Sequence, residues 1–464
     1  MFYLLSCVLL PQLGVPAGRT RASRAGATRY SLVCWRWLRL HVTIRVHPLK
    51  SRRVQAIFTP SYKRIARLFC VAMLGMHLFF LWNVRTRISR GDPDFTAFYA
   101  AATLVRSGHA VDIYNPSAQF RAQVHFTDDS ELRRGPLRYI HPPFETLLFV
   151  PFTFFAYRAA FILWDLANVG MLVAVAVSLR ASLLPNSGIH IWDLVLGLLA
   201  FFPIFANFFQ GQDAILILLV VALAFRAMKL RADFSAGCWM ALGLFRFHLV
   251  IPLVLVLALW GRRRTLLGFV SVTAVLVLTS AVMVGWGNML RYPGYLWLWA
   301  SVPGSGRTPR ALLPSLLGLV TGWPRLDHIH WLVAIVLIVS AWLVIVVARM
   351  KNLAQEPRFF DLCFSCAILA SVLVGYNTST YDLALLVLPL AVTFREGVTE
   401  RVRTRLLLPV VPLLISPFWF LIGMYWQNFN VIAIFLLWWL FALRNEFLRR
   451  QETAPALQPG LPLA

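Results

Sequence analysis

Residues 331–347 read WLVAIVLIVSAWLVIVV, a stretch of 17 residues without a charge. As an α-helix this stretch would be about 25 Å long, which approaches the thickness of the hydrocarbon core of a bilayer. Arg349 and Lys351 follow it, and basic residues are typical of the cytoplasmic end of a membrane helix. The stretch therefore predicts a transmembrane helix whose C-terminal end lies in the cytoplasm.

Similar apolar runs recur along most of the chain and set its class. Hydrophobic residues make up 59% of the 464 residues and charged residues only 14%, whereas soluble domains are about half apolar and about a quarter charged. This composition excludes soluble, disordered and fibrous proteins. We predict an all-α polytopic membrane protein with about ten to twelve membrane helices. The expected crossings are residues 65–82, 158–179, 191–209, 214–228, 266–284, 331–347, 360–374, 383–394, 406–421 and 431–443.

Basic residues outnumber acidic ones, 44 to 19, and their positions predict the orientation of the chain. The Lys and Arg residues that flank the apolar runs place both termini in the cytoplasm of a multi-pass protein of the plasma (inner) membrane. These basic clusters form no separate domain, so we expect membrane lipid, and no nucleic acid, as a partner.

Charge and hydropathy divide the chain into three parts. Residues 1–60 are basic; the stretch from Met1 to Arg67 contains 13 Lys or Arg residues and no acidic residue. We interpret this part either as a flexible or membrane-surface extension or as upstream sequence translated from too early a start. Residues 61–447 form the membrane-embedded domain, and residues 448–464 form a C-terminal tail.

Residues 235–260 do not fit a simple crossing. The segment is apolar, but Arg246 and His248 interrupt it, and both flanks are basic, with Arg231 before it and Arg262 after it. It is either one kinked crossing or a re-entrant pair of half-helices with Arg246 at the break. The second alternative is open because irregular backbone at membrane depth is tolerated where it lines a cavity.

The polar segments collect on the side opposite to the basic helix ends. Residues 83–142 carry six of the 19 acidic residues, and the order of the crossings places this loop outside. The same order places the turns at 210–213 and 375–382 outside. Residues 143–156 are short for a crossing and are expected to form a helix along the outer surface. The positions of these polar segments predict a polar site that faces outward.

Asp94 is the candidate catalytic residue. It ends the stretch Gly91-Asp92-Pro93-Asp94, in which Gly and Pro favour a turn, and an apolar helical face begins at Phe95. At a helix N-terminus Asp94 is either an N-cap or a general base that takes the proton of a hydroxyl group. The pair Asp92-x-Asp94 is also a weak pattern for a divalent metal ion.

Other polar side chains in the outer segments and at the break are candidates for substrate binding. Histidines can hold an anionic group or move a proton, although a loop histidine is alternatively a solvated side chain. An arginine within an apolar run is either functional or extended towards the interface. The remaining residues are hydrogen-bonding groups for a polyhydroxylated ligand, or parts of plain turns. The candidates are Asp92, Tyr99, His141, Gln212, Arg246, His248, Tyr381 and Asp382.

Several spaced motifs together resemble one known family. The motifs Asp94-Phe95-x-x-Phe98-Tyr99-x-Ala101-Ala102, Ile113-Tyr114-x-Pro116 and Tyr139-x-x-Pro142-Pro143 resemble the opening block of glycosyltransferase family 87. Three shorter motifs resemble its later blocks: Gly211-Gln212, Ala236-Gly237 and Tyr381-Asp382-Leu383. The resemblance covers approximately residues 65–447 and implies that the membrane-embedded domain is a glycosyltransferase domain.

The resemblance implies a GT-C-type fold and a hexosyltransferase. It implies transfer of a hexose, mannose favoured, from a polyprenyl-phosphate-sugar donor to a lipid or glycan hydroxyl on the outer face, with inversion. Asp94 would be the base, and Arg246, where family members often carry Lys, would contact the donor phosphate. No cofactor and no metal ligand is assigned, because the phosphate leaves as a stable anion; a divalent metal is compatible but not implied. The turn at 375–382 departs from some relatives, since it contains no histidine.

The main alternative is a polytopic transporter or lipid flippase. Such a protein would carry matched broken segments in two halves, whereas residues 235–260 have no counterpart. A non-catalytic membrane scaffold gives no reason for the acid-rich loop at 83–142. We therefore expect a glycosyltransferase.

Overall fold

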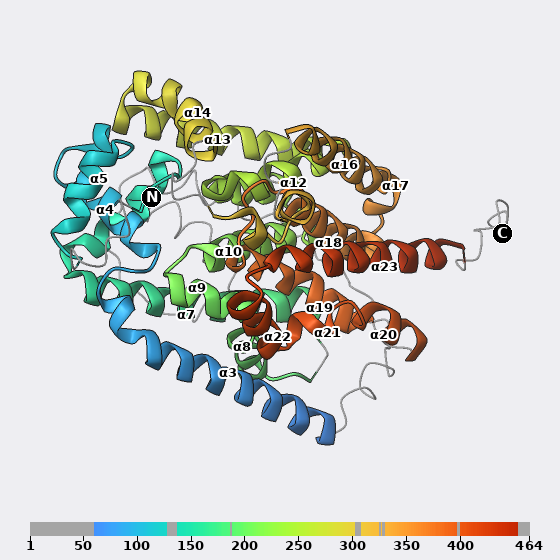
Figure 1. Cartoon of the computed structure of the whole chain (residues 1–464). Coiled ribbons are helices and arrows are strands. Elements are labelled where there is room, and N and C mark those ends of the chain that lie inside the picture. The colour runs from blue at the N-terminus through green and yellow to red at the C-terminus, as the bar shows by residue number, and fades with distance from the viewer. Residues whose placement is uncertain are drawn as a thin grey trace, which may run out of the picture. The chain divides into compact units, whose positions relative to one another are not determined.

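The computed structural model describes residues 60–127, 137–185, 188–301, 308–323, 326, 330–396 and 400–452. The chain divides into Met1–Ala56 and Ile57–Ala464, and all described residues belong to the second unit. Every regular element in these ranges is a helix, which confirms the all-α class (Figure 1). Of the predicted extension at 1–60 only the last residue is described. The acidic residues at 128, 129 and 131 and most of the tail at 448–464 also lie outside the described residues.

Twenty-one α-helices alternate with shorter helical turns in the described ranges. The α-helices up to the middle of the chain are α3 (Pro60–Ser89), α4 (Phe95–Arg106), α5 (Pro116–Val124), α6 (Thr146–Phe149), α7 (Tyr157–Leu183), α8 (Ile191–Leu199), α9 (Phe202–Gln210), α10 (Ala214–Lys229), α11 (Asp233–Leu242) and α12 (Phe247–Leu259). The later ones are α13 (Arg263–Val284), α14 (Trp286–Ser301), α15 (Leu316–Thr321), α16 (His330–Ala348), α17 (Lys351–Ala354), α18 (Pro357–Val374), α19 (Val387–Glu396), α20 (Glu400–Leu407), α21 (Val411–Leu414), α22 (Ser416–Phe420) and α23 (Ile432–Glu452). The turns used below are η2 (Ala110–Asp112), η4 (Pro143–Glu145), η5 (Val150–Phe154), η6 (Gly243–Arg246) and η8 (Tyr381–Leu386).

Seven helical runs among the described residues are long and apolar enough to cross a membrane, or eight if α8 and α9, bent by 67°, form one crossing. The chain is therefore an integral membrane protein. This number is below the ten to twelve helices expected, and the difference is one of helix length. The apolar helix α10 has 16 residues, α19 has only 10, and the run expected at 406–421 is divided among α20, α21 and α22.

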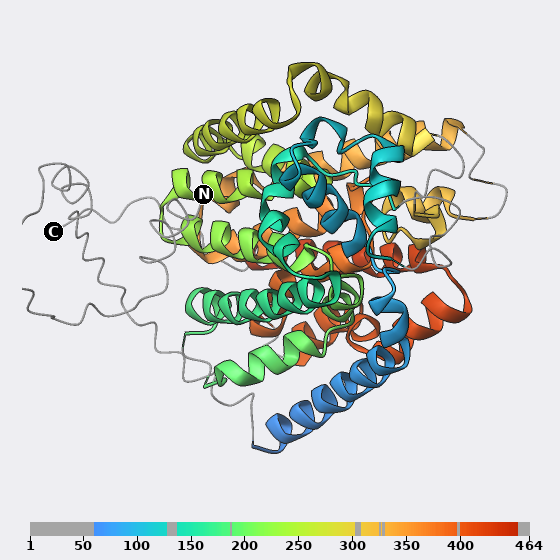
Figure 2. The same ribbon diagram turned by 90° about the vertical axis from the view of Figure 1, so that its left-hand side faces the viewer.

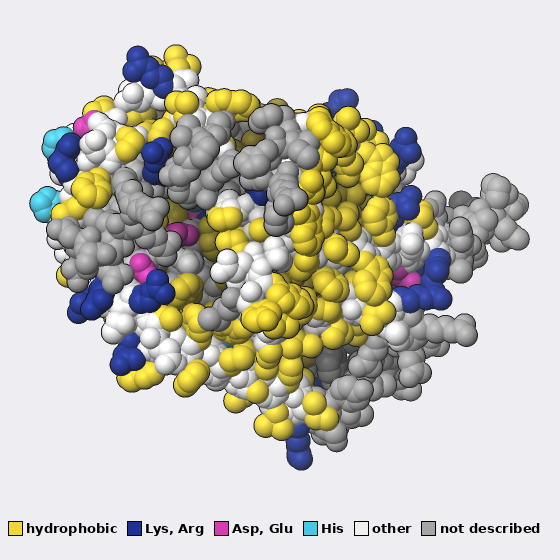
Figure 3. Space-filling view, viewed as in Figure 1, with side chains coloured by type: hydrophobic (Ala, Val, Ile, Leu, Met, Phe, Trp, Pro, Cys, Tyr) yellow, Lys and Arg dark blue, Asp and Glu magenta, His cyan; other side chains and the backbone are white. Residues whose placement is uncertain are grey.

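Hydrophobic side chains on the outside of the bundle agree with a lipid environment. On α16, Trp331, Leu337 and Ile338 are each more than 60% exposed. Hydrophobic side chains cover the middle of the face in Figure 3, and Lys and Arg side chains lie towards its margins. The first crossing, α3, lies at the edge of the bundle in two perpendicular views (Figures 1 and 2). Exposed apolar surface of this extent is stable only in contact with lipid or another apolar surface.

The segment at 235–260 folds back on itself. By length and composition Asp233–Leu259 qualifies as a single crossing, and a straight helix of these 27 residues would hold its ends about 40 Å apart. However, Asp233 at its start and Arg262 just after its end form an ion pair, with Oδ1 and Nη1 3.9 Å apart. The contact supports the re-entrant alternative: α11 and α12 are the arms of a helical hairpin, and η6, which ends at Arg246, is its tip.

Two glycines let α11 and α13 pack closely. A Cβ atom added at Gly237 would clash with the carbonyl oxygen of Thr265, and one added at Gly268 would clash with the carbonyl oxygen of Phe234. Small residues of this kind allow membrane helices to bring their backbones into contact. This contact fixes the first arm of the hairpin and therefore the position of its tip.

Aromatic packing fixes α4 at the end of the bundle that also holds the hairpin tip. The ring of Phe95 meets that of Phe161 edge to face, with centroids 5.4 Å apart, and Phe98 stacks on Phe149 at 4.6 Å. Gly211, with φ +61°, passes so close to Phe95 and Phe161 that a Cβ atom would collide with both. Asp94, which directly precedes α4, is thereby held next to the turn that contains Gly211.

Replacing Gly237 with Val should destabilise the protein. The added side chain would force α11 and α13 apart, and overpacking of this kind typically costs about 1–3 kcal/mol. We expect a lower Tm for the purified protein in detergent. Gly170→Val is the matched control, because Gly170 lies in α7 and an added Cβ has no neighbour within 4 Å. Equal Tm values for the two variants would show that the helix contact is looser than described.

Candidate active site

A cavity of about 110 Å³ lies among segments that are far apart in the sequence. Its walls are the N-terminal end of α4, the loop 137–141, the tip of the α11–α12 hairpin, and the turn before η8. Apolar side chains such as Phe98, Leu296 and Trp299 line it together with a few polar groups, which is typical of a ligand site. The charged, imidazole and amide side chains that line it are Asp94, Arg138, His141, Gln212, Arg246, His248 and Asn377.

Arg246 forms the centre of a buried ionic network. The side chain is only 2% exposed, its Nε donates to Oδ1 of Asp213 at 2.7 Å, and its Nη1 lies 3.3 Å from Oδ1 of Asp382. Its Nη2 donates to the side-chain oxygen of Gln212. The guanidinium therefore connects the hairpin tip with the turn before α10 and with η8.

The turn before α10 leaves the carboxylate of Asp213 available for this network. Asp213 occupies the N-cap position of α10 but makes no capping hydrogen bond with its side chain. Instead, Oδ1 of Asn207 accepts hydrogen bonds from the backbone N–H groups of Ala214 and Ile215, at 2.8 and 3.2 Å. A side chain from the preceding helix thus caps α10, and Asp213 pairs with Arg246.

Asp94 is joined to the same network through Gln212. Asp94 is the N-cap of α4 but makes no side-chain capping bond there. Its Oδ2 accepts a hydrogen bond of 2.7 Å from Nε2 of Gln212, and its backbone N–H donates to the side-chain oxygen of Gln210. The amide of Gln212 therefore bridges Asp94 and Arg246. The alternative interpretation, that Asp94 serves as a helix cap through its carboxylate, is not supported.

Asp382 and His248 complete the network on the side of η8. Oδ2 of Asp382 accepts a hydrogen bond of 2.7 Å from the backbone N–H of Ser379 and lies 3.5 Å from Nε2 of His248. Burial alone would raise the pKa of Asp382, but the charge of Arg246 and the contact with His248 outweigh it, so this pKa is below its usual value. Asp382 is therefore ionised, and it is a counter-ion of Arg246.

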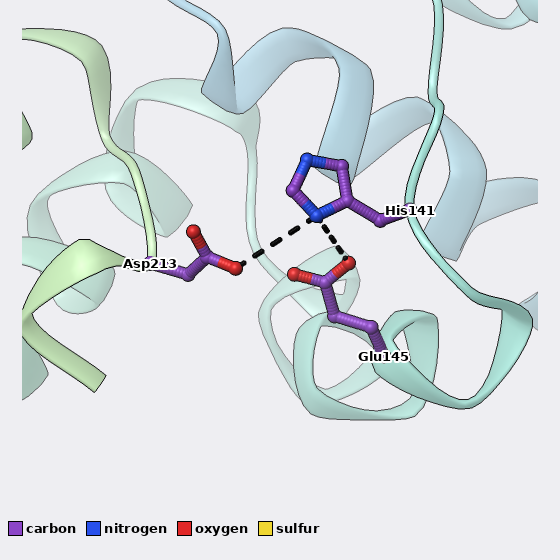
Figure 4. A group of neighbouring side chains, drawn as sticks. All are labelled: His141, Glu145 and Asp213. Carbon is purple, nitrogen blue, oxygen red and sulfur yellow. Dashed lines mark ion pairs between the residues drawn. The ribbon is translucent and has the colours of Figure 1, made fainter. Parts of the chain in front are cut away.

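His141 faces two buried acids, Glu145 and Asp213 (Figure 4). Its Nδ1 lies 2.9 Å from Oε2 of Glu145 and 3.9 Å from Oδ2 of Asp213. Burial, reinforced by the charge of Arg246, lowers the pKa of His141 to about 4, so its imidazole is neutral at pH 7. Burial also raises the pKa values of Glu145 and Asp213 to about 7.

Tyrosine hydroxyl groups hold the loop that carries His141. They donate hydrogen bonds to three successive backbone carbonyls: Tyr295 to Tyr139 at 3.1 Å, Tyr292 to Ile140 at 2.9 Å, and Tyr114 to His141 at 2.7 Å. Because the loop has no regular secondary structure, these bonds replace the ladder that a helix or strand would supply. Two of the three tyrosines come from α14, which therefore positions His141.

The other predicted site residues lie at different distances from the cavity. Tyr381 borders it, with its ring centroid 5.0 Å from Cζ of Arg246. Tyr99 is buried in the apolar core, and its hydroxyl group donates to the carbonyl oxygen of Phe155. Asp92 forms an ion pair with Arg87 at 2.8 Å. The substrate roles of all eight candidates stay predictions, and the contacts support Tyr99 and Asp92 least.

Sequence reasoning missed Glu145 and did not select Asp213. Glu145 is the only charged residue in the apolar segment 143–156, and a charged group in an apolar run is a reasonable functional candidate. It also stands four residues after His141, a spacing that favours contact on a helical turn. Asp213 could have been selected for the same reason, because it directly precedes the apolar helix α10.

Comparison with known proteins gives one match. The sequence model of glycosyltransferase family 87 matches residues 139–375, just over half of the chain. The chain belongs to glycosyltransferase family 87. No curated protein and no solved structure matches it.

Membership of the family makes the chain a glycosyltransferase and decides against the transporter and scaffold alternatives. The matched segment contains His141, Gln212, Asp213 and Arg246, the centre of the network. Asp94 and Asp382 lie outside the matched range, so it is the fold that brings Asp94 to the cavity of this glycosyltransferase and Asp382 to Arg246 in its wall.

Replacing Arg246 with Met should destabilise the enzyme strongly. Asp213 and Asp382 would remain buried without their cation, and removal of one partner of a buried ion pair typically costs about 3–5 kcal/mol. We expect a large decrease in Tm in detergent, with part of the stability retained in Arg246→Lys. Arg263→Met, at an exposed arginine of α13, should leave Tm nearly unchanged. If Arg246→Met had the same small effect, the network would not support the fold.

Proposed function

We propose that this glycosyltransferase transfers a hexose, mannose favoured, from a polyprenyl-phosphate-sugar to a hydroxyl group of a lipid or glycan on the outer face of the membrane, with inversion and on a GT-C-type fold. The observation that carries the proposal is the position of Asp94. Its carboxylate borders the cavity and is oriented by Gln212, which is itself held by Arg246. A carboxylate held in this way at a ligand cavity has the geometry of a general base.

The proposed reaction is one displacement. The acceptor oxygen forms a bond to the anomeric carbon of the sugar while the bond from that carbon to the phosphate oxygen breaks, and the hydroxyl proton passes to Asp94. The polyprenyl phosphate leaves as an anion, and the configuration of the anomeric carbon is inverted because the acceptor attacks from the opposite face. Cationic side chains near the departing oxygen stabilise the charge that develops there.

Two arginines border the cavity, and their surroundings suggest different roles. Arg246 is neutralised by Asp213 and Asp382, so a donor phosphate would share it with two carboxylates. Arg138 borders the same cavity, and its side chain has no ion-pair partner among the residues that the structure describes. An arginine without a counter-ion is better suited to bind a phosphate through paired hydrogen bonds. We therefore assign the main phosphate contact to Arg138 and a supporting one to Arg246.

The outer location of the site is supported by charge. The cytoplasmic ends expected from sequence carry many basic residues, such as those after residue 347 and those around residue 400. The cavity lies at the other ends of the helices: the C-terminal end of α18 leads into the turn with Tyr376 and Asn377, which line it. A lipid-linked donor reaches such a site from the bilayer.

Replacing Asp94 with Asn should abolish transfer and leave the fold intact. An amide has the same shape and can still accept the hydrogen bond from Gln212, but it cannot take a proton, and loss of a general base typically costs about 10²–10⁴-fold in rate. The measurement is incorporation of labelled sugar from polyprenyl-phosphate mannose, with Tm as the control for folding. Asp112→Asn, in η2, should have ordinary activity. Activity of Asp94→Asn within a few-fold of wild type would remove Asp94 from the mechanism.

Replacing Arg138 with Met should weaken binding of the donor without loss of the fold. Loss of a hydrogen bond to a charged group costs about 1.5–3 kcal/mol, which would appear as a higher KM for the lipid donor with kcat less affected. Arg121→Met, at an exposed position of α5, is the control. If the KM for the donor is unchanged in Arg138→Met, Arg138 does not bind the phosphate, and Arg246 would be its main contact.

The donor class itself is tested with purified protein in nanodiscs. Labelled polyprenyl-phosphate mannose, polyprenyl-phosphate glucose and a nucleotide sugar are compared, and the products are separated as lipids and glycans. We expect transfer from polyprenyl-phosphate sugars, with mannose preferred. Transfer from the nucleotide sugar alone would overturn the proposed donor, while the family assignment would stand.

A further inference from the structure

Three side chains from separate segments converge next to the cavity, which His141 lines (Figure 4). His141 belongs to the loop after residue 137, Glu145 ends η4, and Asp213 precedes α10. One nitrogen or oxygen atom of each lies within 4.8 Å of those of the other two. Two ligands that are each about 2 Å from the same ion are at most about 4 Å apart, so a small contraction of this group would suffice to bind one.

The charge around these residues is unbalanced. Glu145, Asp213 and Asp382 are each at most 2% exposed, and the only cation buried among them is Arg246. Arg246 contacts Asp213 and Asp382, so Glu145 has no guanidinium or ammonium partner among the described residues. Buried charges are normally paired or coordinate a metal ion, and one divalent cation would neutralise the excess.

Unpartnered atoms point into the space between the three side chains. No N–H or O–H group of another described residue donates to Oε1 of Glu145 or Oδ2 of Asp213, whose carboxyl groups lie within hydrogen-bonding reach of each other, and Nδ1 of His141 makes no hydrogen bond of normal geometry. Figure 4 shows these atoms facing one another. Buried acceptors without donors are rare in folded proteins and normally indicate a missing partner.

We propose that His141, Glu145 and Asp213 bind a divalent cation. One imidazole nitrogen and two carboxylate oxygens form a mixed set, and Zn²⁺ and Mn²⁺ accept such ligands, whereas Ca²⁺ and Mg²⁺ prefer oxygen alone. Sequence analysis assigned no metal ligand, because the phosphate of the expected donor leaves as a stable anion, and the three residues come together only in the folded chain.

The surroundings of the three residues fit a metal site. The hydroxyl group of Tyr139 donates to Oε2 of Glu145 at 3.1 Å, and Nε of Arg246 donates to Oδ1 of Asp213, which leaves Oδ2 of Asp213 for the cation. Metal ligands are normally oriented by such outer hydrogen bonds. The same cation would hold the loop of His141 against α10 and so shape the wall of the cavity.

The proposal is tested by direct binding, independently of sugar transfer. The full chain in detergent is treated with a chelator, and binding of Zn²⁺, Mn²⁺, Ca²⁺ and Mg²⁺ is measured separately by calorimetry and by metal analysis after dialysis. We expect one Zn²⁺ or Mn²⁺ per chain, and weaker binding of Ca²⁺ and Mg²⁺. Absence of stoichiometric binding, or tighter binding of Ca²⁺, would overturn the proposal.

Variants identify the ligands. Glu145→Gln and His141→Ala should each lower the affinity at least 10-fold. Tyr139→Phe, which removes the hydrogen bonds of the hydroxyl group to Glu145 and to the carbonyl oxygen of Pro142, should lower it about 10–100-fold. His109→Ala, an exposed histidine of the same outer region, is the matched control. If Glu145→Gln or His141→Ala fails to fold, Tyr139→Phe still tests the metal site, because this variant keeps the aromatic ring and its packing. Affinity unchanged in Tyr139→Phe and Glu145→Gln would show that the ion binds elsewhere.

Discussion

The fold around the cavity depends on one buried guanidinium, that of Arg246. A charge in an apolar bundle is stable only if it is paired and its hydrogen-bonding groups are satisfied. Arg246 meets this requirement with Asp213 and Asp382, and each of these carboxylates needs the arginine equally. Because the three residues come from the hairpin tip, the turn before α10 and η8, the ionic requirement fixes the relative positions of these segments.

The polar groups near the cavity are positioned by side chains as much as by secondary structure. Asn207 caps α10 and so leaves Asp213 for Arg246. Gln212 accepts a hydrogen bond from Arg246 and donates one to Asp94, so the position of Asp94 depends on that of Arg246. Residues of a site that are held in this way lose little freedom when a ligand binds, and preorganisation of this kind is a main source of enzymatic rate enhancement.

The helices predicted from long, uninterrupted apolar runs agree best with the structure. The runs expected at 158–179, 266–284 and 331–347 agree closely with α7, α13 and α16, because a bilayer-length apolar stretch has few stable conformations other than a helix. The run at 406–421 was wrong as a single helix, since its residues are divided among α20, α21 and α22. Two of its three prolines, Pro412 and Pro417, stand at the first turns of α21 and α22, where proline is tolerated while it ends the preceding helix.

The sequence by itself determined the all-α membrane class, the family and the two residues whose setting is most unusual, Asp94 and Arg246. These follow from local properties: apolar length, flanking charge and a charged group within an apolar run. Only the tertiary structure decided that Arg246 is paired with Asp213 and Asp382, that the segment at 235–260 returns to the end where it began, and that Glu145 lies beside His141 and Asp213. Apart from the contact between His141 and Glu145, these pairings join residues separated by tens of positions or more, and they depend on how the helices pack, which no local pattern of residues encodes.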